Sequence, residues 1–379
     1  MAGHLLVTND FPPKTGGIQV YLHELWRRLE PGRAVVLTAS SHPDSETFDA
    51  TSGVATERVS ASTLFAPTRG ALGAIESAIE RYRPDLVLLD PAWPLGLLGP
   101  HLSRPYGVIL HGAEVTVPGR LPLVGASLRR VLRHATVAVC AGGYPEAEAR
   151  RNAADFMPPV VQVPPGVDTS RFVPLGRPER DAVRRSMGLD EDGLLVSSYS
   201  RLVPRKGMDT LIRASARLRA DFPALHVAIG GDGRDRARLE KLARSTDAPV
   251  TFLGRVPDEQ LAPWLASSDL MVMDCRSRWL GLEQEGFGIV FVEAMSCAVA
   301  QVAGRSGGSH EAVLDGVTGL VLDGSRRVRA LVDAMGELLG DEGRRQRYAD
   351  ASRSVALERF EWSTLATRLG AGLKPFDHF

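Results

Sequence analysis

The chain has 379 residues, of which 44% are hydrophobic, and its 45 lysine and arginine residues balance 45 aspartate and glutamate residues. This length exceeds one ordinary hydrophobic core and predicts two domains of roughly 170 to 190 residues each. The balanced charge creates no overall field that would recruit nucleic acid, so we predict no nucleic-acid partner. Any attraction for anions must come from local clusters of charge.

Cys140, Cys275 and Cys297 lie in apolar stretches and form no C-x-x-C pair. Isolated cysteines in odd number are typical of reduced thiols in a cytoplasmic protein, and they predict no zinc site. The chain leads directly into the apolar run at residues 5–7 without a charged leader, and no apolar run is long enough to span a membrane. We therefore expect a cytoplasmic protein.

Short apolar runs alternate with amphipathic segments through the first half of the chain. Such alternation predicts buried parallel strands joined by helices, which is the pattern of a doubly wound α/β domain. The strands are expected at residues 5–7, 34–37, 86–89, 106–110, 136–139 and 160–163, and the clearest helices at 18–29, 71–82 and 124–133.

A second series of strands follows a segment rich in turn formers, residues 164–190, which we interpret as a hinge region. Its strands are expected at 194–198, 226–230, 250–253, 270–273, 300–303 and 319–322. Residues 359–379 contain a helical pattern with Ser363 as a candidate N-cap. This C-terminal helix either crosses back to the first domain or completes the second.

Gly16 and Gly17 stand between the first strand and the first long helix, in the segment NDFPPKTGGIQ at residues 9–19. Without side chains, they allow backbone N–H groups at a helix N-terminus to approach an anion such as a diphosphate. The segment matches neither the G-x-G-x-x-G motif nor a Walker loop. A Gly-Gly pair before a helix is also a common turn, which is the structural alternative.

Three cations, Arg201, Arg205 and Lys206, occur in the segment SRLVPRKG at residues 200–207, after a strand and directly before a helix. Cations at this end of a helix repel its dipole unless an anion is present, so the segment favours an anion site. Arg201 offers a planar fork and Lys206 a point charge for a pyrophosphate, whereas Arg205 could instead be solvated.

Glu285 and Glu293 bracket a glycine-bearing apolar run, EGFGIVFVE. On one continuous helix the two carboxylates would lie on the order of 12 Å apart, too far to serve one small ligand. We therefore place Glu285 in a loop and begin a helix near Ile289, so that Glu293 lies in its first turns. This arrangement predicts a nucleotide-sugar site; a surface acid and a helix-terminal acid are the alternative.

His111 follows the strand at residues 106–110 and is either an imidazole at the ligand edge or a core histidine satisfied by backbone. Glu114 could orient it or cap a helix. The glycine turns at residues 230–233 and 307–308 are interpreted as structural first. The basic residues around the helix at 124–133 could hold anionic lipid headgroups or form a solvated face; they are Arg120, Arg129, Arg130, Arg133 and His134.

Taken together, these motifs resemble the retaining glycosyltransferases of family four, and the resemblance covers almost the whole chain. Residues 8–19, 200–207 and 285–294 are similar to the PimB-type phosphatidylinositol mannosyltransferases of actinobacteria. The resemblance implies the GT-B architecture, an α/β fold with two Rossmann-like doubly wound domains facing an interdomain cleft. Residues 1–170 would form the N-terminal acceptor domain and residues 171–358 the C-terminal nucleotide-sugar donor domain.

The resemblance also implies roles around the diphosphate. Arg201 and Lys206 would neutralise the departing diphosphate, and Gly16 and Gly17 would cradle it. Glu293 would accept hydrogen bonds from the ribose hydroxyls of the donor.

Further implied roles concern the transferred sugar and the base. Glu285 and the backbone N–H groups of Phe287, Gly288 and Ile289 would bind the sugar hydroxyls. His111 would lie near the reacting centre, and Val256 would lie near the guanine. The implied catalytic residues are thus His111, Arg201, Lys206 and Glu285.

The implied activity is transfer of mannose, with retention, from GDP-mannose to an anionic phosphatidylinositol mannoside-type lipid at the inner face of the cell membrane. The donor is a substrate, and neither cofactor nor metal is implied. The chain departs from the family pattern at residues 297–301, which lack a Gly-x-Pro turn, and in the loop at 276–284. Another nucleotide sugar, a soluble acceptor and a non-catalytic nucleotide-sugar sensor remain the alternatives.

Overall fold

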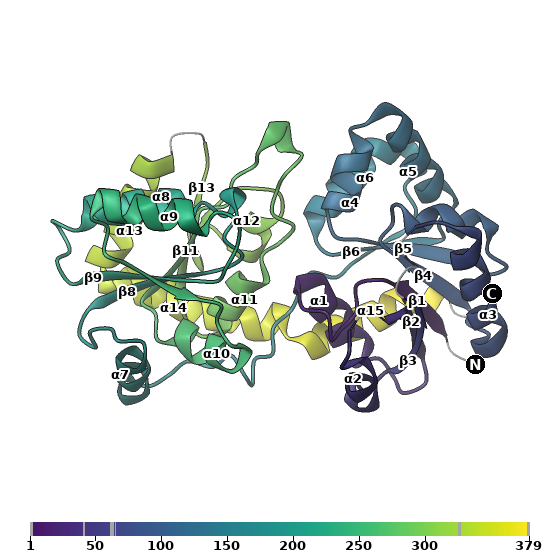
Figure 1. Cartoon of the computed structure of the whole chain (residues 1–379), viewed down its shortest axis with the longest axis horizontal. Helices are drawn as coiled ribbons and strands as arrows, with labels where there is room; N and C mark the ends of the chain where they lie inside the picture. The colour runs from purple at the N-terminus through teal and green to yellow at the C-terminus, as the bar shows by residue number, and fades with distance from the viewer. Residues whose placement is uncertain (1–2, 41, 61–63, 65, 325–326, 377–379) are drawn as a thin grey trace. The chain divides into compact units, whose positions relative to one another are not determined.

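The computed structural model describes residues 3–40, 42–60, 64, 66–324 and 327–376. The chain divides into two compact units, the first formed by Met1–Gly166 with Trp362–Phe379 and the second by Val167–Glu361. Each unit has its own parallel sheet with helices on both faces (Figure 1). The predicted pair of Rossmann-like α/β domains is therefore confirmed.

The sheet of the first unit has seven described strands in the order β3-β2-β1-β4-β5-β6-β7. Its order reverses between β1 and β4, and ligands of such sheets bind beyond the strand ends at this switch point. The strands are β1 (His4–Thr8), β2 (Ala34–Ser40), β3 (Ala55–Ser60), β4 (Leu86–Asp90), β5 (Tyr106–Leu110), β6 (Val137–Cys140) and β7 (Val160–Gln162).

Alternate residues of these strands bury opposite faces of the sheet. Leu5 and Val7 enter a core with Ile75 of α3, whereas Leu6 packs with Tyr21 of α1 on the other face. The helices of the unit are α1 (Gly17–Trp26), α2 (Ser45–Thr51), α3 (Arg69–Tyr82), η1 (Leu95–His101), α4 (Ala113–Gly119), α5 (Pro122–His134), α6 (Gly143–Ala153), η2 (Ala154–Phe156), α15 (Trp362–Leu373) and η6 (Lys374–Phe376).

The sheet of the second unit has six described strands in the order β10-β9-β8-β11-β12-β13, with its switch point between β8 and β11. The strands are β8 (Leu194–Tyr199), β9 (Leu225–Gly230), β10 (Val250–Gly254), β11 (Leu270–Met273), β12 (Ala300–Gly304) and β13 (Gly319–Leu322). Its helices are α7 (Arg177–Ser186), η3 (Pro204–Lys206), α8 (Met208–Leu218), α9 (Arg236–Thr246), α10 (Asp258–Ala266), η4 (Trp279–Gly281), α11 (Ile289–Ser296), α12 (Ser309–Ala312), α13 (Arg327–Gly340), α14 (Glu342–Val355) and the π-helical turn η5 (Ala356–Phe360).

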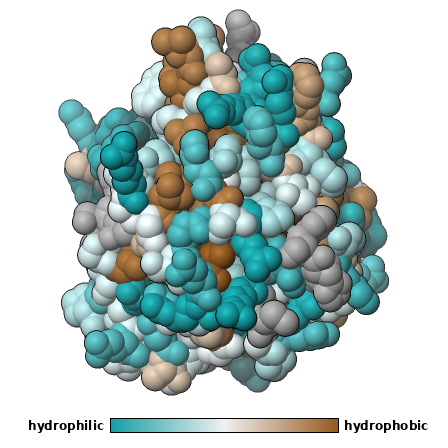
Figure 2. Space-filling model, turned by 90° about the vertical axis from the view of Figure 1, so that its right-hand side faces the viewer, coloured by the Kyte–Doolittle hydropathy of each residue, from teal (hydrophilic) through white to brown (hydrophobic). Residues whose placement is uncertain are grey.

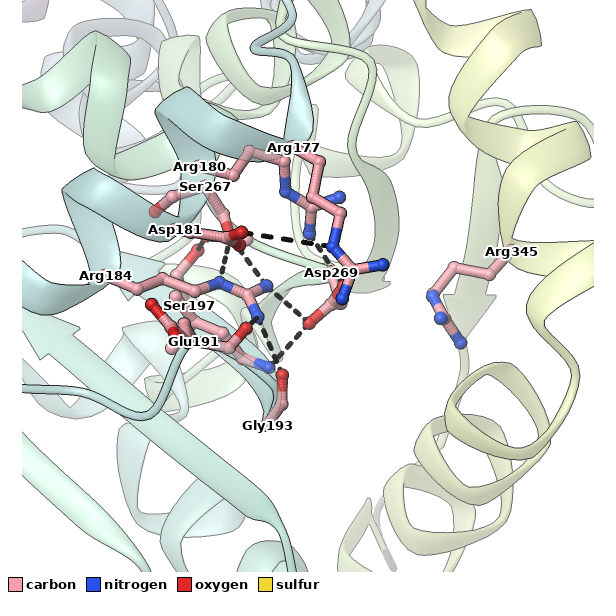
Figure 3. A network of polar contacts seen from close by, with 12 residues as sticks. Arg177, Arg180, Asp181, Arg184, Glu191, Gly193, Ser197, Ser267, Asp269 and Arg345 are labelled. Atoms are coloured by element: carbon pink, nitrogen blue, oxygen red, sulfur yellow. Dashed lines mark hydrogen bonds and ion pairs between the residues drawn. The ribbon is translucent and has the colours of Figure 1, made fainter.

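The segment predicted as a hinge contains α7, which is fixed to the rest of the second unit by Arg184. This side chain is 4% exposed and donates hydrogen bonds to the carbonyl oxygens of Ser267 and Gly193 and to the Asp269 carboxylate (Figure 3). A guanidinium buried in this way is tolerated only when its donors are satisfied. Residues 177–186 therefore belong to the framework of the unit, and the hinge interpretation is wrong for them.

The end of the chain forms α15, which belongs to the first unit. Trp362 is 2% exposed, and its ring lies 6.4 Å from that of Tyr21 in α1. The predicted N-cap at Ser363 is wrong, because the helix already includes Trp362, whose burial fixes where the helix begins. The preceding Glu361 has an extended backbone and accepts a hydrogen bond from the Thr169 amide.

Candidate functional site

Most of the predicted ligand-binding residues lie near the carboxyl ends of strands close to the two switch points. In the first unit they follow β1 and β5; in the second most follow β8 and β11, Val256 follows β10, and Ile289 and Glu293 lie in α11. Carboxyl ends of parallel strands share one edge of a sheet, so each unit gathers its loops at that edge.

Gly16 is the N-cap of α1 and Gly17 is the first residue of the helix, and both are exposed. Its φ of 160° is extended backbone that any residue adopts, so the sharp turn predicted for the glycine pair is wrong at this position. A Cβ atom at Gly16 would instead lie 2.3 Å from Oε1 of Gln19. Gln19 donates a hydrogen bond from Nε2 to the Asp10 carboxylate at 2.7 Å. A side chain at Gly16 would fit only if the flexible end of Gln19 moved away from Asp10.

His111 is held by a buried carboxylate at the end of β4. Its Nε2 lies 2.7 Å from Oδ1 of Asp90, and Thr8 donates a hydrogen bond to Oδ2 of Asp90 at 2.6 Å. Burial lowers the pKa of His111, but the Asp90 carboxylate outweighs burial, so that the pKa lies above its ordinary value. The Tyr21 ring packs edge-on against the imidazole at 5.4 Å. The ring is therefore fixed in orientation and favoured in its charged form.

Glu114 caps a helix and does not hold the imidazole. Its Oε1 accepts hydrogen bonds from the backbone N–H groups of His111 and Gly112, at 2.5 and 3.0 Å, ahead of α4. Of the two predicted alternatives for Glu114, the structure shows capping. Asp90 supplies the orienting carboxylate that sequence reasoning missed, although its place directly after an apolar strand is a signal that could have found it.

In the second unit, Lys206 and Glu285 form a buried ion pair. Nζ of Lys206 lies 2.8 Å from Oε2 of Glu285, and both residues are 8% exposed. Burial raises the pKa of Glu285, but Lys206 and Arg205 outweigh burial, so that the pKa lies below its ordinary value. Glu285 is therefore ionised at neutral pH. A buried cation and a buried anion at one strand edge can bind the phosphate and the hydroxyls of one ligand.

Arg205 forms ion pairs, so the alternative prediction that this side chain is solvated is wrong. Its side chain is 18% exposed and lies 3.5 Å from Glu285 and 3.6 Å from Glu283. Glu283 also pairs with Arg278 at 2.7 Å and with Arg234 at 3.7 Å. Sequence reasoning missed Glu283, because two of its three partners, Arg205 and Arg234, come from separate loops that no local pattern relates to it.

The Gly307–Gly308 turn fixes the backbone of Glu285. The Gly308 amide donates to the Glu285 carbonyl at 3.0 Å, and the Ser306 hydroxyl accepts from the Glu285 amide at 3.3 Å. Gly307 has a φ of 53°, and a Cβ atom there would lie 2.1 Å from the Glu285 carbonyl oxygen. Its predicted role as a structural turn is confirmed, and what the turn supports is the candidate sugar-binding loop.

Glu293 lies in α11, which begins at Ile289 as the sequence predicts. Gly288, with a φ of 92°, is the N-cap, and a Cβ atom there would lie 2.8 Å from the ring of Phe291. Burial raises the pKa of Glu293 to about 7, against the opposing effect of Arg171. Phe287, ahead of the helix, is 5% exposed. Glu293 therefore changes charge near neutral pH.

Two predicted residues stand apart from the Lys206–Glu285 pair. Arg201 is exposed, and among the described residues no ion pair joins it to Glu285. Val256 is partly buried in the loop after β10. Their assignments to the diphosphate and the base stay predictions.

Within the described residues no group of three or more histidine, cysteine, aspartate or glutamate side chains could hold a metal ion. No helix in the same part of the chain has the length and apolarity needed to cross a membrane.

The chain is similar to known glycosyltransferases in sequence and in fold. The family model of the group 1 glycosyl transferases matches residues 179–355. A GDP-mannose-dependent alpha-(1-6)-phosphatidylinositol monomannoside mannosyltransferase of Mycolicibacterium smegmatis is 38% identical over 376 residues, 96% of each chain. The GDP-mannose-dependent monoacylated alpha-(1-6)-phosphatidylinositol monomannoside mannosyltransferase of Corynebacterium glutamicum is 33% identical over 370 residues, again 96% of each.

Among solved structures, Anabaena Alr3699/HepE in complex with UDP has a TM-score of 0.82 and 20% sequence identity, covering 99% of this chain and 100% of that one. A sucrose-phosphate synthase from Thermosynechococcus elongatus also has a TM-score of 0.82. At this identity the likeness concerns the fold, and the predicted GT-B class is confirmed.

Proposed function

This chain belongs to the group 1 glycosyl transferases, in the branch of the actinobacterial phosphatidylinositol monomannoside mannosyltransferases, and from that premise we propose that it transfers mannose from GDP-mannose to a phosphatidylinositol mannoside. The buried Lys206–Glu285 pair carries the proposal. A nucleotide sugar brings a diphosphate and a ring of hydroxyls, which are the two kinds of group that this pair can bind. The full-length similarity to named mannosyltransferases supports mannose as the sugar.

Proposed roles follow from the positions of the charges. Lys206 binds the diphosphate as it departs, with the exposed Arg201 as a second cation. Glu285 accepts hydrogen bonds from the sugar, and its ion pair with Lys206 holds it ionised for that purpose. Preorganised charges of this kind act where charge develops in the transition state. We propose that the product retains the anomeric configuration, with the acceptor attacking on the face from which the diphosphate leaves.

Residues of the first unit complete the proposal. The departing phosphate accepts the acceptor proton, so no enzyme nucleophile is required. The imidazole of His111, oriented by Asp90, whose carboxylate outweighs burial and raises the pKa of the ring, stabilises negative charge near the reacting centre. Gly16 and Gly17 leave their backbone open to the donor.

Glu293 makes the affinity for GDP dependent on pH. In the free protein its pKa is about 7, so the carboxylate that would accept ribose hydrogen bonds is only a minor species at pH 6. We expect the GDP affinity to rise by about fivefold to tenfold between pH 6 and pH 8, in proportion to the ionised fraction. Isothermal titration calorimetry at several pH values measures this. In Glu293→Gln the slope should vanish; an unchanged slope would mean that another group titrates.

The ionisation of Glu293 also makes the stability of the folded protein depend on pH. The pKa of Glu293 in the folded protein is about 7, above its ordinary value of 4.5. The protonated carboxyl therefore stabilises the folded protein fully below about pH 4.5, and this stabilisation is lost as the pH rises through about 7. In the absence of GDP, Glu293→Gln should therefore be more stable than the unsubstituted protein at pH 8.

The acceptor and the donor can be identified in one experiment. The protein is incubated with labelled GDP-mannose and a total lipid extract, and the product is identified by mass spectrometry. We expect a lipid that has gained one hexose. Label found only in water-soluble products would favour a soluble acceptor, and thermal stabilisation by UDP-sugars but not by GDP or GDP-mannose would overturn the donor assignment.

We propose further that the protein works at a membrane surface, because the lipid acceptor resides there. Hydrophobic side chains of the first unit gather at the upper edge of the face in Figure 2, the end at which Figure 1 places α4 and α5. In α5, Leu123 is 89% exposed, and Leu121 directly before the helix is 48% exposed. Arg129 and Arg130 on α5 are exposed as well. Apolar and basic side chains together favour an anionic lipid surface.

A further inference from the structure

The loop after β11 forms a short hairpin, residues 278–283, whose backbone polar groups bond largely to each other. Arg278 and Glu283 pair as an antiparallel bridge, with the Arg278 amide donating to the Glu283 carbonyl at 2.9 Å. At the tip, the Gly281 amide donates to the Arg278 carbonyl at 2.9 Å, and the Leu282 amide donates to the Trp279 carbonyl at 3.1 Å. The tip is therefore a defined turn.

This turn presents large apolar side chains to solvent. Leu280 is 100% exposed, Trp279 61% and Leu282 37%. Trp279 and Leu280 also adopt left-handed backbone conformations, with φ of 49° and 54°, which side chains other than glycine rarely adopt. Strained conformations at consecutive residues persist only when the surroundings hold them, and they are concentrated at functional segments.

A basic collar surrounds the base of the hairpin. The Glu283 carboxylate faces three guanidinium groups, those of Arg278, Arg205 and Arg234, so the cluster has excess positive charge. Arg234 is 65% exposed, and Arg278 lies over the Trp279 ring at 4.7 Å. The apolar tip is thus followed by cations at the level where a lipid would present its phosphate.

We propose that this hairpin is a membrane-docking element of the second unit, with Trp279 and Leu280 inserted at the boundary between headgroups and acyl chains of an anionic bilayer. The inference rests on the proposed function, which brings the protein to such a bilayer. Tryptophan favours this interfacial region, and arginine favours anionic headgroups. An apolar environment also favours backbone groups that are satisfied internally, and the bonds within the turn satisfy the Gly281 and Leu282 amides and the Arg278 and Trp279 carbonyls.

Ion pairs connect the base of the hairpin to the candidate sugar-binding pair, Lys206 and Glu285. Glu283 joins the hairpin base to Arg205, and Arg205 in turn faces Glu285 of the candidate sugar-binding pair. A bilayer that holds the tip therefore holds the donor-binding loop at the height of the lipid headgroups. Ion pairs through Arg205 therefore connect the docked hairpin to the proposed transfer site.

Tryptophan fluorescence tests this directly. Of the five tryptophans, Trp26 and Trp362 are buried, Trp93 and Trp264 are partly buried, and Trp279 is exposed. Phosphatidylinositol-containing vesicles made with brominated acyl chains should quench emission of the whole protein. Trp279→Phe should abolish this quenching while retaining vesicle binding in sedimentation. Absence of quenching in the unsubstituted protein would overturn the proposal.

Binding itself is measured with a double variant, Trp279→Ser with Leu280→Ser. We expect vesicle affinity to fall by at least about tenfold, because the loss of even one of the two large apolar side chains from the bilayer has an effect of that size. GDP binding checks that the variant is folded. A matched control replaces Val317 and Leu357, which are 48% and 47% exposed elsewhere on this unit, by serine and should bind as before. Equal loss in both double variants would contradict a specific hairpin.

The two proposals fail separately. Quenching without mannose transfer would leave the docking element and remove the proposed activity. Suppose instead that the unsubstituted protein shows no quenching and that the serine double variant transfers mannose to lipid at the full rate. This result would support the proposed activity and remove the docking element.

Discussion

Lys206→Ala should lower kcat for mannose transfer by about 10² to 10³-fold, the effect seen when one preorganised electrostatic donor is removed from an active site. Lys206 is the buried cation of the candidate site, and its ammonium lies 2.8 Å from Glu285. Water that enters in its place cannot neutralise the departing diphosphate as well. Single-turnover kinetics with labelled GDP-mannose measure the chemical step.

The variant also leaves the Glu285 carboxylate without its closest partner. Arg205 remains at 3.5 Å, so we expect a moderate loss of stability, about 2 kcal/mol, smaller than for a charge left wholly unpaired. Lys206→Met combined with Glu285→Gln removes both charges and should recover the stability but not the rate. Lys241, exposed on α9, gives a control whose replacement by alanine should change neither. Full activity in Lys206→Ala would refute the proposed role.

The largest effect on stability is expected from Arg184→Ala. Figure 3 shows the Arg184 guanidinium surrounded by the carbonyl oxygens of Ser267 and Gly193 and by Asp269. Removing the side chain takes this donor away from the buried carbonyl oxygens of Ser267 and Gly193 and opens a void beneath α7, whereas Asp269 keeps Arg180 and the Leu195 amide as partners. We expect the free energy of unfolding of the second unit to fall by roughly 3 to 5 kcal/mol.

Urea unfolding with hydrogen exchange of the β8 and β11 amides measures this loss in the unit concerned. Arg177 lies on the same helix with its side chain 82% exposed, so Arg177→Ala is the matched control and should alter stability by less than about 0.5 kcal/mol. An unchanged urea midpoint in Arg184→Ala would show that the network contributes no net stability.

The elements predicted with the right bounds include two central strands that are completely buried. The apolar runs at residues 106–110 and 270–273 became strands with those bounds, because central parallel strands are covered on both faces. Strand β3 escaped prediction. It is an edge strand with the sequence ATERVS, and an edge strand half open to water needs no apolar run.

The sequence predicted which types of residue form the candidate site, but not which of these residues contact each other. The loop position of Glu285 and the helix start at Ile289 followed from glycine spacing. The approach of Lys206 to Glu285, and of Asp90 to His111, joins loops that are distant along the chain. Such contacts depend on the order of the strands in the sheet, because neighbouring strand ends bring their loops together. A local sequence pattern does not determine this order.

The place of α15 determines the order in which the protein can assemble on the ribosome. The first unit lacks one of its own helices until residues 362–373 have been synthesised, and until then the pocket that receives Trp362 beside Tyr21 has no occupant. The second unit is continuous in the chain and can close as soon as it has emerged. The half of the protein made first is therefore completed last, and its unfinished apolar face must be shielded during translation.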